Sequence, residues 1–204
     1  MNLKPLLPGH VLVCPLEPHK RLTDLSAPEL TDLFQAVQRV QRMLARHYFT
    51  APPPSSTAPA TTTSPPVAAD GATPAAPAPG QPEAGSFNIA VQDGSGAGQT
   101  VPHVHVHVIP RIAGETAKDP RTAGDAIYEG MAAEGGNVGG ALWDRELGRR
   151  PAPGGGFARI EDAARVGRSM DEMAAEADLF RGVLADMARE EMREEREAGE
   201  AQTS

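Results

Sequence analysis

Apolar residues recur every three or four positions over residues 27–49, which places them on one face of an α-helix. Just ahead of this segment, Ser26 and Glu29 have the spacing of a capping box, and Pro28 falls where a first helical residue tolerates a missing N–H. The pattern therefore predicts an amphipathic helix at about 27–49. Its apolar residues are Leu30, Leu33, Phe34, Val37, Val40, Leu44 and Tyr48.

Three shorter segments have the pattern of β-strands. Residues 10–16 are rich in Val and Leu, residues 86–92 alternate apolar and polar positions, and residues 103–109 alternate His with Val up to a proline. We predict strands at His10–Leu16, Ser86–Gln92 and His103–Ile109, with Pro110 ending the last one. The glycine-rich turn at residues 93–98 would join the second and third strands as an antiparallel pair.

The other segments differ in composition. Residues 51–82 hold ten Pro and nine Ala, so they cannot bury enough apolar surface to offset the entropy of ordering. We expect a disordered Pro/Ala/Thr-rich insertion at 51–83, a mobile glycine-rich loop at 131–168, and a C-terminal helix with an acidic tail at 169–204. The predicted fold class is α+β, an antiparallel sheet with a long helix packed on it and a C-terminal helix.

Composition limits the class of protein. The chain has 204 residues, which suits one domain with tails. Of its net charge of −8, residues 161–204 contribute −7 through 13 acids and 6 bases, so the body carries −1. The sequence contains no Lys/Arg stripe and no run of 18 apolar residues, so we expect neither nucleic-acid binding nor a membrane span. Cys14 is the only cysteine, and we expect a soluble intracellular protein without an intrachain disulfide.

Three of the six histidines lie on one predicted strand, at His103, His105 and His107. Because the side-chain period of a strand is two, all three imidazoles would project from one sheet face, with valines filling the core behind them. Nucleophilic catalysis, metal ligation and a structural histidine ladder are the possible interpretations. Metal ligation is disfavoured because the chain has no second cysteine, and no carboxylate stands next to the strand.

The segment His103-Val104-His105-Val106-His107-Val108-Ile109 resembles the signature of the histidine triad superfamily. Further segments resemble its fragile-histidine-triad branch, whose members are bis(5'-adenosyl)-triphosphatases. Relative to that branch, we expect the chain to lack the N-terminal strands that wall the base pocket, so that residues 1–130 would form the histidine triad domain around the insertion. The similar segments are Pro8–Leu16, Gln92–Gly94, Ala97–Val101, Ala126–Glu129 and Met173–Ala177.

The resemblance implies roles for the histidines. His105 would attack the α-phosphorus of a dinucleoside polyphosphate to form a nucleotidyl-histidine, and a backbone carbonyl accepting its other ring N–H would fix the tautomer. His107 would bond the phosphate oxygens and steady the leaving group, while His103 would support the array. His10 resembles a fourth histidine that buttresses the triad.

The resemblance also implies substrate contacts outside the histidines. A glycine-rich loop would bring backbone N–H groups to the phosphates, and a glutamine would contact the phosphate chain. Asn2 aligns with a ribose-contacting residue, although we expect the second residue of a chain to fray. Tyr128 lies where the branch often carries a regulatory tyrosine. The predicted substrate-binding residues are Asn2, Gln92, Gly98, Gln99, Thr100, Val101 and His107.

The leading hypothesis is hydrolysis of diadenosine triphosphate-like substrates to AMP and ADP by a homodimer. The alternatives are a non-catalytic nucleotide sensor or scaffold, and a nucleoside phosphoramidate hydrolase. We expect no metal site in the protein and no tightly bound cofactor, with a divalent cation, Mg²⁺ or Mn²⁺, able to arrive on the substrate phosphates. The expected location is the cytoplasm, with the nucleus as a second compartment.

Overall fold

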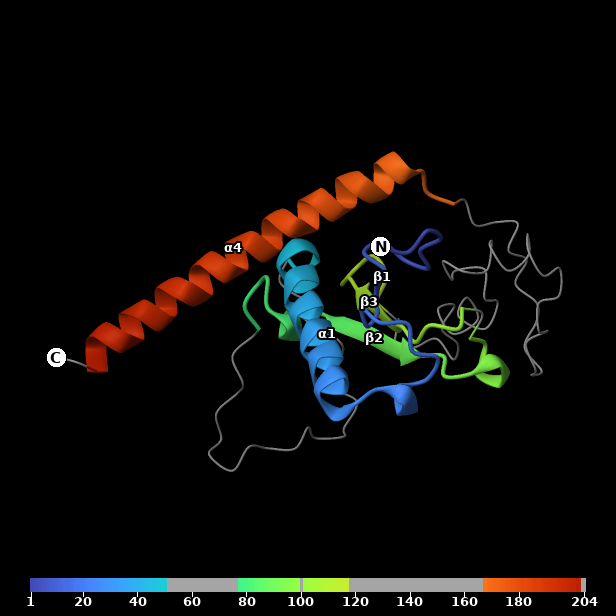
Figure 1. The fold of residues 1–204 in the computed structure, drawn as a ribbon. Coiled ribbons are helices and arrows are strands. Elements are labelled where there is room, and N and C mark those ends of the chain that lie inside the picture. The colour runs from blue at the N-terminus through green and yellow to red at the C-terminus, as the bar shows by residue number, and fades with distance from the viewer. Residues whose placement is uncertain (51–76, 100, 118–166, 203–204) are drawn as a thin grey trace, which may run out of the picture.

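The computed structural model describes residues 1–50, 77–99, 101–117 and 167–202. Helix α1 spans Ala27–Tyr48, as its periodicity predicts, and Ser26 and Glu29 form the expected capping box at its start. Three strands, β1 (Val11–Val13), β2 (Ser86–Val91) and β3 (Val106–Arg111), form one antiparallel sheet in the order β1-β3-β2. The predicted α+β architecture is therefore confirmed for the described residues (Figure 1).

The predicted strand at 10–16 is too long. β1 pairs with β3 from Val11 opposite Val108 to Val13 opposite Val106, and it ends there. The chain beyond Val13 soon reaches Pro15, which has no N–H to donate to a ladder. β1 is therefore a three-residue strand.

The predicted strand at 103–109 is displaced. β3 begins at Val106 and runs through Pro110 to Arg111, so His103 and His105 precede it. Val108 is the last β3 residue that pairs with β1. Pro110 lies beyond it, where β3 pairs with β2 on one side only within the described residues, so the missing N–H of the proline is tolerated. β2 pairs with β3 along its whole length, which confirms the predicted antiparallel pair.

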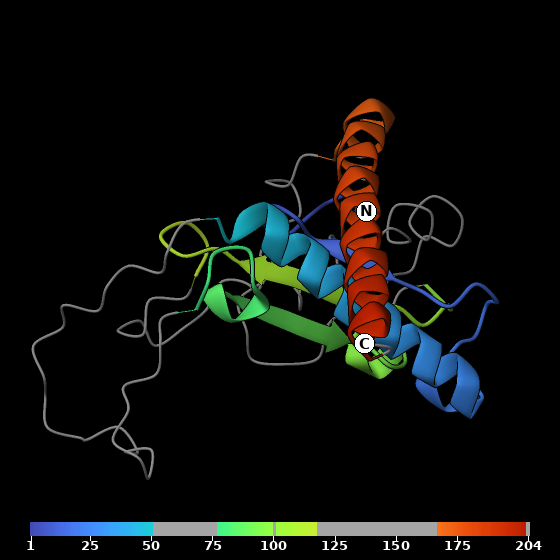
Figure 2. The ribbon, with the colours of Figure 1, turned by 90° about the vertical axis from the view of Figure 1, so that its left-hand side faces the viewer.

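The core lies between the sheet, α1 and the C-terminal helix α4 (Met170–Gln202). α1 packs on the sheet, and α4 packs on α1 (Figure 1). Figure 2 shows α4 crossing α1 and continuing past it. The main core cluster joins the four elements β1, α1, β3 and α4 through Val11, Leu33, Val37, Met43, Leu44, Val106, Val108, Phe180 and Met187.

α4 lies within the predicted segment 169–204, and its charged final turns remain helical to Gln202. Part of its acidity is paired with α1. Glu190 and Glu191 form ion pairs with Arg46 and Arg39 of α1. The acidic C-terminal region therefore helps to dock the helix, in addition to carrying charge on its exposed side.

Several sequence predictions fall outside the described residues. Residues 51–76 of the expected insertion, most of the loop at 131–168, Thr100 and Tyr128 all belong to this group. The last part of the expected insertion is described, and it leads into a short 3₁₀ helix at Pro82–Ala84, with Gly80 N–H bonded to Phe49 O. Among the described residues, no helix has the length and apolarity that a membrane span requires.

Candidate active site

Three buried histidine rings meet at the side of β3. The rings of His10 and His107 have centroids 5.1 Å apart, and those of His105 and His107 are also 5.1 Å apart. His105 and His107 are each 4 % exposed, and His10 is fully buried. The sheet brings them together, because β1 places His10 beside the strand that carries His107. Val104, Val106 and Val108 are fully buried on the other side, as the alternation predicts.

Hydrogen bonds to the main chain determine which ring nitrogens carry protons. The N–H of Leu6 donates to His10 Nδ1 at 3.1 Å, so this nitrogen must be an acceptor. His10 therefore carries its proton on Nε2, which lies 2.9 Å from His107 Nδ1. Because His10 donates this bond, His107 accepts at Nδ1 and carries its own proton on Nε2.

His107 Nε2 is the end of this chain of bonds. It is buried and has no hydrogen-bond partner within the part of the chain that the structure describes. A buried N–H without a partner costs free energy, and such groups in native proteins usually have a functional reason. An anionic oxygen placed at this N–H would satisfy it.

His105 has the opposite tautomer. Its Nδ1 lies 2.8 Å from the backbone carbonyl of His103, and because a carbonyl only accepts, Nδ1 must donate. The lone pair of the neutral ring is therefore on Nε2. Burial lowers the pKa of His105 below its ordinary value of 6.5. The ring consequently stays neutral near pH 7, as a nucleophile or base must be.

Burial, together with the smaller effect of the neighbouring His105, lowers the pKa of His107 to about 4. Both rings are therefore neutral at neutral pH. The two rings, whose centroids are 5.1 Å apart, carry complementary groups, since His105 has a lone pair on Nε2 and His107 has an N–H on Nε2.

His103 is oriented by the segment that follows β1. Its Nε2 donates to the carbonyl of Pro15 at 3.1 Å, and the ring is partly buried. The next residue, Val104, donates its N–H to the carbonyl of His19 at 2.7 Å. These two bonds fix the chain just ahead of His105, which agrees with the supporting position expected for His103.

The predicted phosphate-binding loop is a constrained turn. Gln92 directly follows β2, and the turn beyond it contains a short 3₁₀ helix at Ser95–Ala97, which is followed by Gly98 with φ of +89°. The Gln99 amide has internal partners, because its Oε1 accepts from Gly94 N at 2.9 Å and its Nε2 donates to Lys20 O at 2.7 Å. The side chain of Gln99 thus braces the loop, and Val101 is partly buried.

Asn2 does not fray, so that prediction is wrong. The residue is fully buried, with its amide nitrogen 3.2 Å from His10 Nδ1 and its N–H 3.3 Å from His10 O. Its Oδ1 accepts from the N–H of Lys4 at 3.0 Å. A ribose contact would have to replace these bonds.

The sequence reasoning missed two residues that support the histidines. Leu6 acts through its main chain, which leaves no signal in the sequence. Arg168 binds the carbonyl of Asn2, and it stands just before the Ser169–Glu172 capping box that begins α4. The Ser-x-x-Glu spacing was a detectable signal for this helix start.

In the described part of the chain, no group of three or more His, Cys, Asp or Glu side chains is arranged to hold a metal ion. The bond from His10 Nε2 to His107 Nδ1 uses two ring nitrogens that would otherwise be metal donors. The arrangement therefore suits acid–base and nucleophilic chemistry on an anionic substrate.

Comparison with known proteins agrees with this geometry. The family model for the HIT domain matches residues 1–114, and the chain belongs to this family. The chain is 33 % identical to an asymmetrical bis(5'-nucleosyl)-tetraphosphatase of Schizosaccharomyces pombe, over 91 % of this chain and 83 % of the relative. It is 32 % identical to a bifunctional bis(5'-adenosyl)-triphosphatase/adenylylsulfatase of Arabidopsis thaliana, over 90 % of this chain and 71 % of the relative.

Proposed function

We propose that the protein hydrolyses dinucleoside polyphosphates, including diadenosine triphosphate, to mononucleotides. The observation that carries this proposal is the pair of opposite tautomers at the site. The bond from His105 Nδ1 to His103 O leaves a lone pair on Nε2 of a buried neutral ring, while the His10 bond gives His107 an N–H to present. The names of the relatives support the same substrate class.

The reaction would proceed in two displacements. His105 Nε2 attacks the α-phosphorus of the substrate, so a P–N bond forms and the bond from phosphorus to the bridging oxygen breaks. The leaving nucleotide departs with the electron pair of that bond, and the N–H of His107 stabilises the charge on the oxygen. Water then attacks the same phosphorus, breaks the P–N bond and releases AMP. With diadenosine triphosphate the other product is ADP.

The variant His105→Asn tests the proposal. Asparagine removes the nucleophile and leaves the fold intact, so turnover of diadenosine triphosphate should fall to background while the circular dichroism spectrum is unchanged. His19→Gln is a matched control, because His19 is a partly buried histidine that pairs with Glu29. The control should keep wild-type turnover. If the His105→Asn variant still turns over substrate, His105 is not the nucleophile, and if the wild type binds substrate without turnover, the protein is a sensor.

We also propose that the active species is a homodimer. In the described part of the sheet, the outer edge of β2 has no neighbouring strand. Ile89 on this strand and Phe34 on α1 are large apolar residues that are 43 % and 41 % exposed. An open strand edge and exposed apolar side chains favour association between copies. Sedimentation velocity of the purified chain measures its mass directly.

A further inference from the structure

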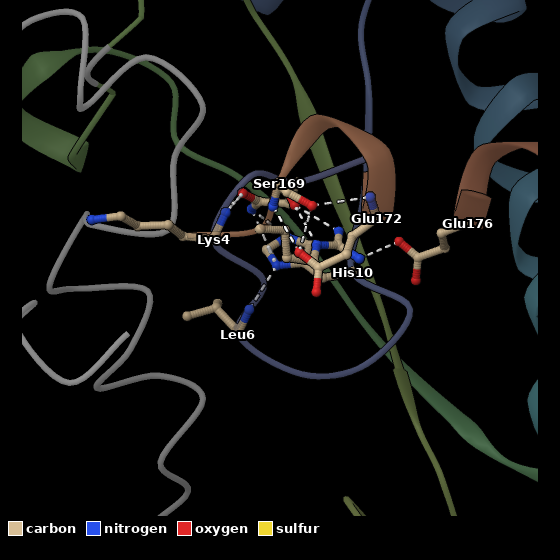
Figure 3. A network of polar contacts seen from close by, with 8 residues as sticks. Lys4, Leu6, His10, Ser169, Glu172 and Glu176 are labelled. Carbon is tan, nitrogen blue, oxygen red and sulfur yellow. Dashed lines mark hydrogen bonds and ion pairs between the residues drawn. The ribbon is translucent and has the colours of Figure 1, made fainter. Parts of the chain in front are cut away.

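The start of α4 is bound to the N-terminal segment beside the active site. The backbone N–H of Arg168 donates to Leu3 O at 2.9 Å. The guanidinium group donates twice to the carbonyl of Asn2, from Nη2 at 2.6 Å and from Nε at 3.2 Å. These bonds join residues that are 166 positions apart in the sequence. Figure 3 shows this network of polar contacts around His10.

The guanidinium group is held in place from its other side. Arg168 Nη1 forms an ion pair with Glu176, which lies within α4. Both side chains are largely buried, at 19 % and 18 % exposed. The helix start is fixed as well, since Ser169 and Glu172 form a capping box, with Ser169 N–H donating to Glu172 Oε2 at 2.7 Å. A guanidinium group that is already held by an ion pair loses little further conformational freedom when it binds a carbonyl.

The bonds continue from Asn2 to the catalytic ring. Asn2 contacts His10 through its main-chain N–H and its amide nitrogen, and His10 donates to His107 Nδ1. Each step involves buried groups, because Asn2 and His10 are fully buried and His107 is 4 % exposed. Hydrogen bonds of this kind set the orientation and the tautomer of a catalytic imidazole.

We propose that Arg168 is a positioning residue for this reaction: it holds Asn2 against His10, and so keeps His107 oriented with its Nε2–H toward the substrate. The expected effect on kcat rests on the proposed function. The orientation and tautomers of the His10 and His107 rings can be measured without substrate. The residue that leads into α4 therefore contributes to catalysis, although no described contact joins Arg168 directly to the rings of His10, His105 or His107.

Two measurements on the full chain test the proposal, with Arg168→Met as the main variant. The first is the tautomer of each ring, read from the ¹⁵N shifts of the imidazole nitrogens by NMR. The wild type should show protons on Nε2 of His10 and His107 and on Nδ1 of His105. In Arg168→Met, the signals of His10 and His107 should shift or show mixed tautomers, while His105 keeps its proton on Nδ1.

The second measurement is kinetic. Misplacing a catalytic group by about 1 Å can cost roughly 100-fold, so kcat of Arg168→Met on diadenosine triphosphate should fall by about tenfold to hundredfold with KM little changed. The loss should be much smaller with AMP 4-nitrophenyl ester, because nitrophenolate leaves without help from His107. A purely structural role would lower both activities equally.

The controls separate the possible failures. Arg181→Met removes an arginine that pairs with Asp178 on the exposed side of α4, so it should match the wild type in both measurements. Arg168→Lys keeps the positive charge but not the planar guanidinium group. Its NMR signals and its kcat should lie between those of the wild type and those of Arg168→Met. If Arg168→Met does not fold, unchanged tautomers and kinetics in Arg168→Lys would overturn the proposal, and altered ones would support it.

The proposal fails if Arg168→Met keeps the wild-type tautomers and a kcat within about twofold of the wild type. Failure of the proposed function gives a different result. In that case the wild type itself has no turnover on either substrate, and the NMR signals still report whether Arg168 orients His10 and His107.

Discussion

At the scale of single residues, the chemistry depends on which nitrogen of each ring carries the proton. Two main-chain groups decide this, the carbonyl of His103 for His105 and the N–H of Leu6 for His10. The backbone therefore fixes the protonation pattern, and side-chain identity alone does not. A histidine placed at either position without these bonds would have no preferred role as donor or acceptor.

The lowered pKa of His105 predicts the pH dependence of activity. A base with a lowered pKa stays neutral to a more acidic pH, so kcat/KM for diadenosine triphosphate should stay level from neutral pH to below 6.5 and then fall. Protonation of His107, whose pKa is about 4, should add a second decline. A profile of kcat/KM against pH measures this. An acidic limb centred at or above 6.5 would contradict the burial argument.

The histidine spacing indicated where two of the three clustered histidine rings lie. The residues His103, His105 and His107 signal themselves by alternation, and the structure groups His105 and His107 with His10. The supports of the site were not predictable. Leu6 and Pro15 act through backbone atoms, and Arg168 is brought to Asn2 only by the packing of distant segments.

At the scale of elements, a close approach of three segments positions His10. Gly9 precedes it with φ of +75°, a backbone conformation that residues with a side chain rarely adopt. A Cβ at this position would lie 2.5 Å from Tyr48 Cε2 at the end of α1 and 2.9 Å from Pro110 Cγ in β3. Gly9 therefore lets β1, α1 and β3 meet beside the histidine cluster.

The substitution Gly9→Ala should therefore lower the free energy of unfolding by at least about 2 kcal/mol, from backbone strain and overpacking together. Gly114→Ala isolates the strain, because Gly114 has φ of +78° and open space around it, and Gly96→Ala should be nearly neutral. Urea denaturation measures all three. If Gly9→Ala lowers the free energy of unfolding no more than Gly114→Ala does, the close approach of the segments at Gly9 does not affect stability.

The elements themselves were predictable to different degrees. α1 was predictable to within a residue, because its periodicity and capping box are both local signals. The ends of β1 and β3 were not, since a strand ends where its neighbour ends. The continuation of β3 through Pro110 shows this, because it depends on β1 beginning only at Val11, opposite Val108.

At the scale of the whole molecule, the packing of α4 connects the C-terminal region to the active site. Phe180 and Met187 insert into the core, and Arg46 and Arg39 of α1 pair with acids of α4. Arg168, which leads into α4, then binds the N-terminal segment at Asn2, and Figure 3 shows the start of α4 beside His10. The composition revealed the helix and its charge, but it gave no indication that the helix supports the histidines.

The central claim is that His105 forms a covalent bond to the nucleotide, and one measurement tests it most directly. The purified chain is mixed briefly with diadenosine triphosphate at low temperature, quenched, and analysed by intact-mass spectrometry with peptide mapping. The expected result is a mass increase equal to one adenylyl group, located on His105 and absent from His105→Asn. ADP release without any adduct, or an adduct on another residue, would contradict it.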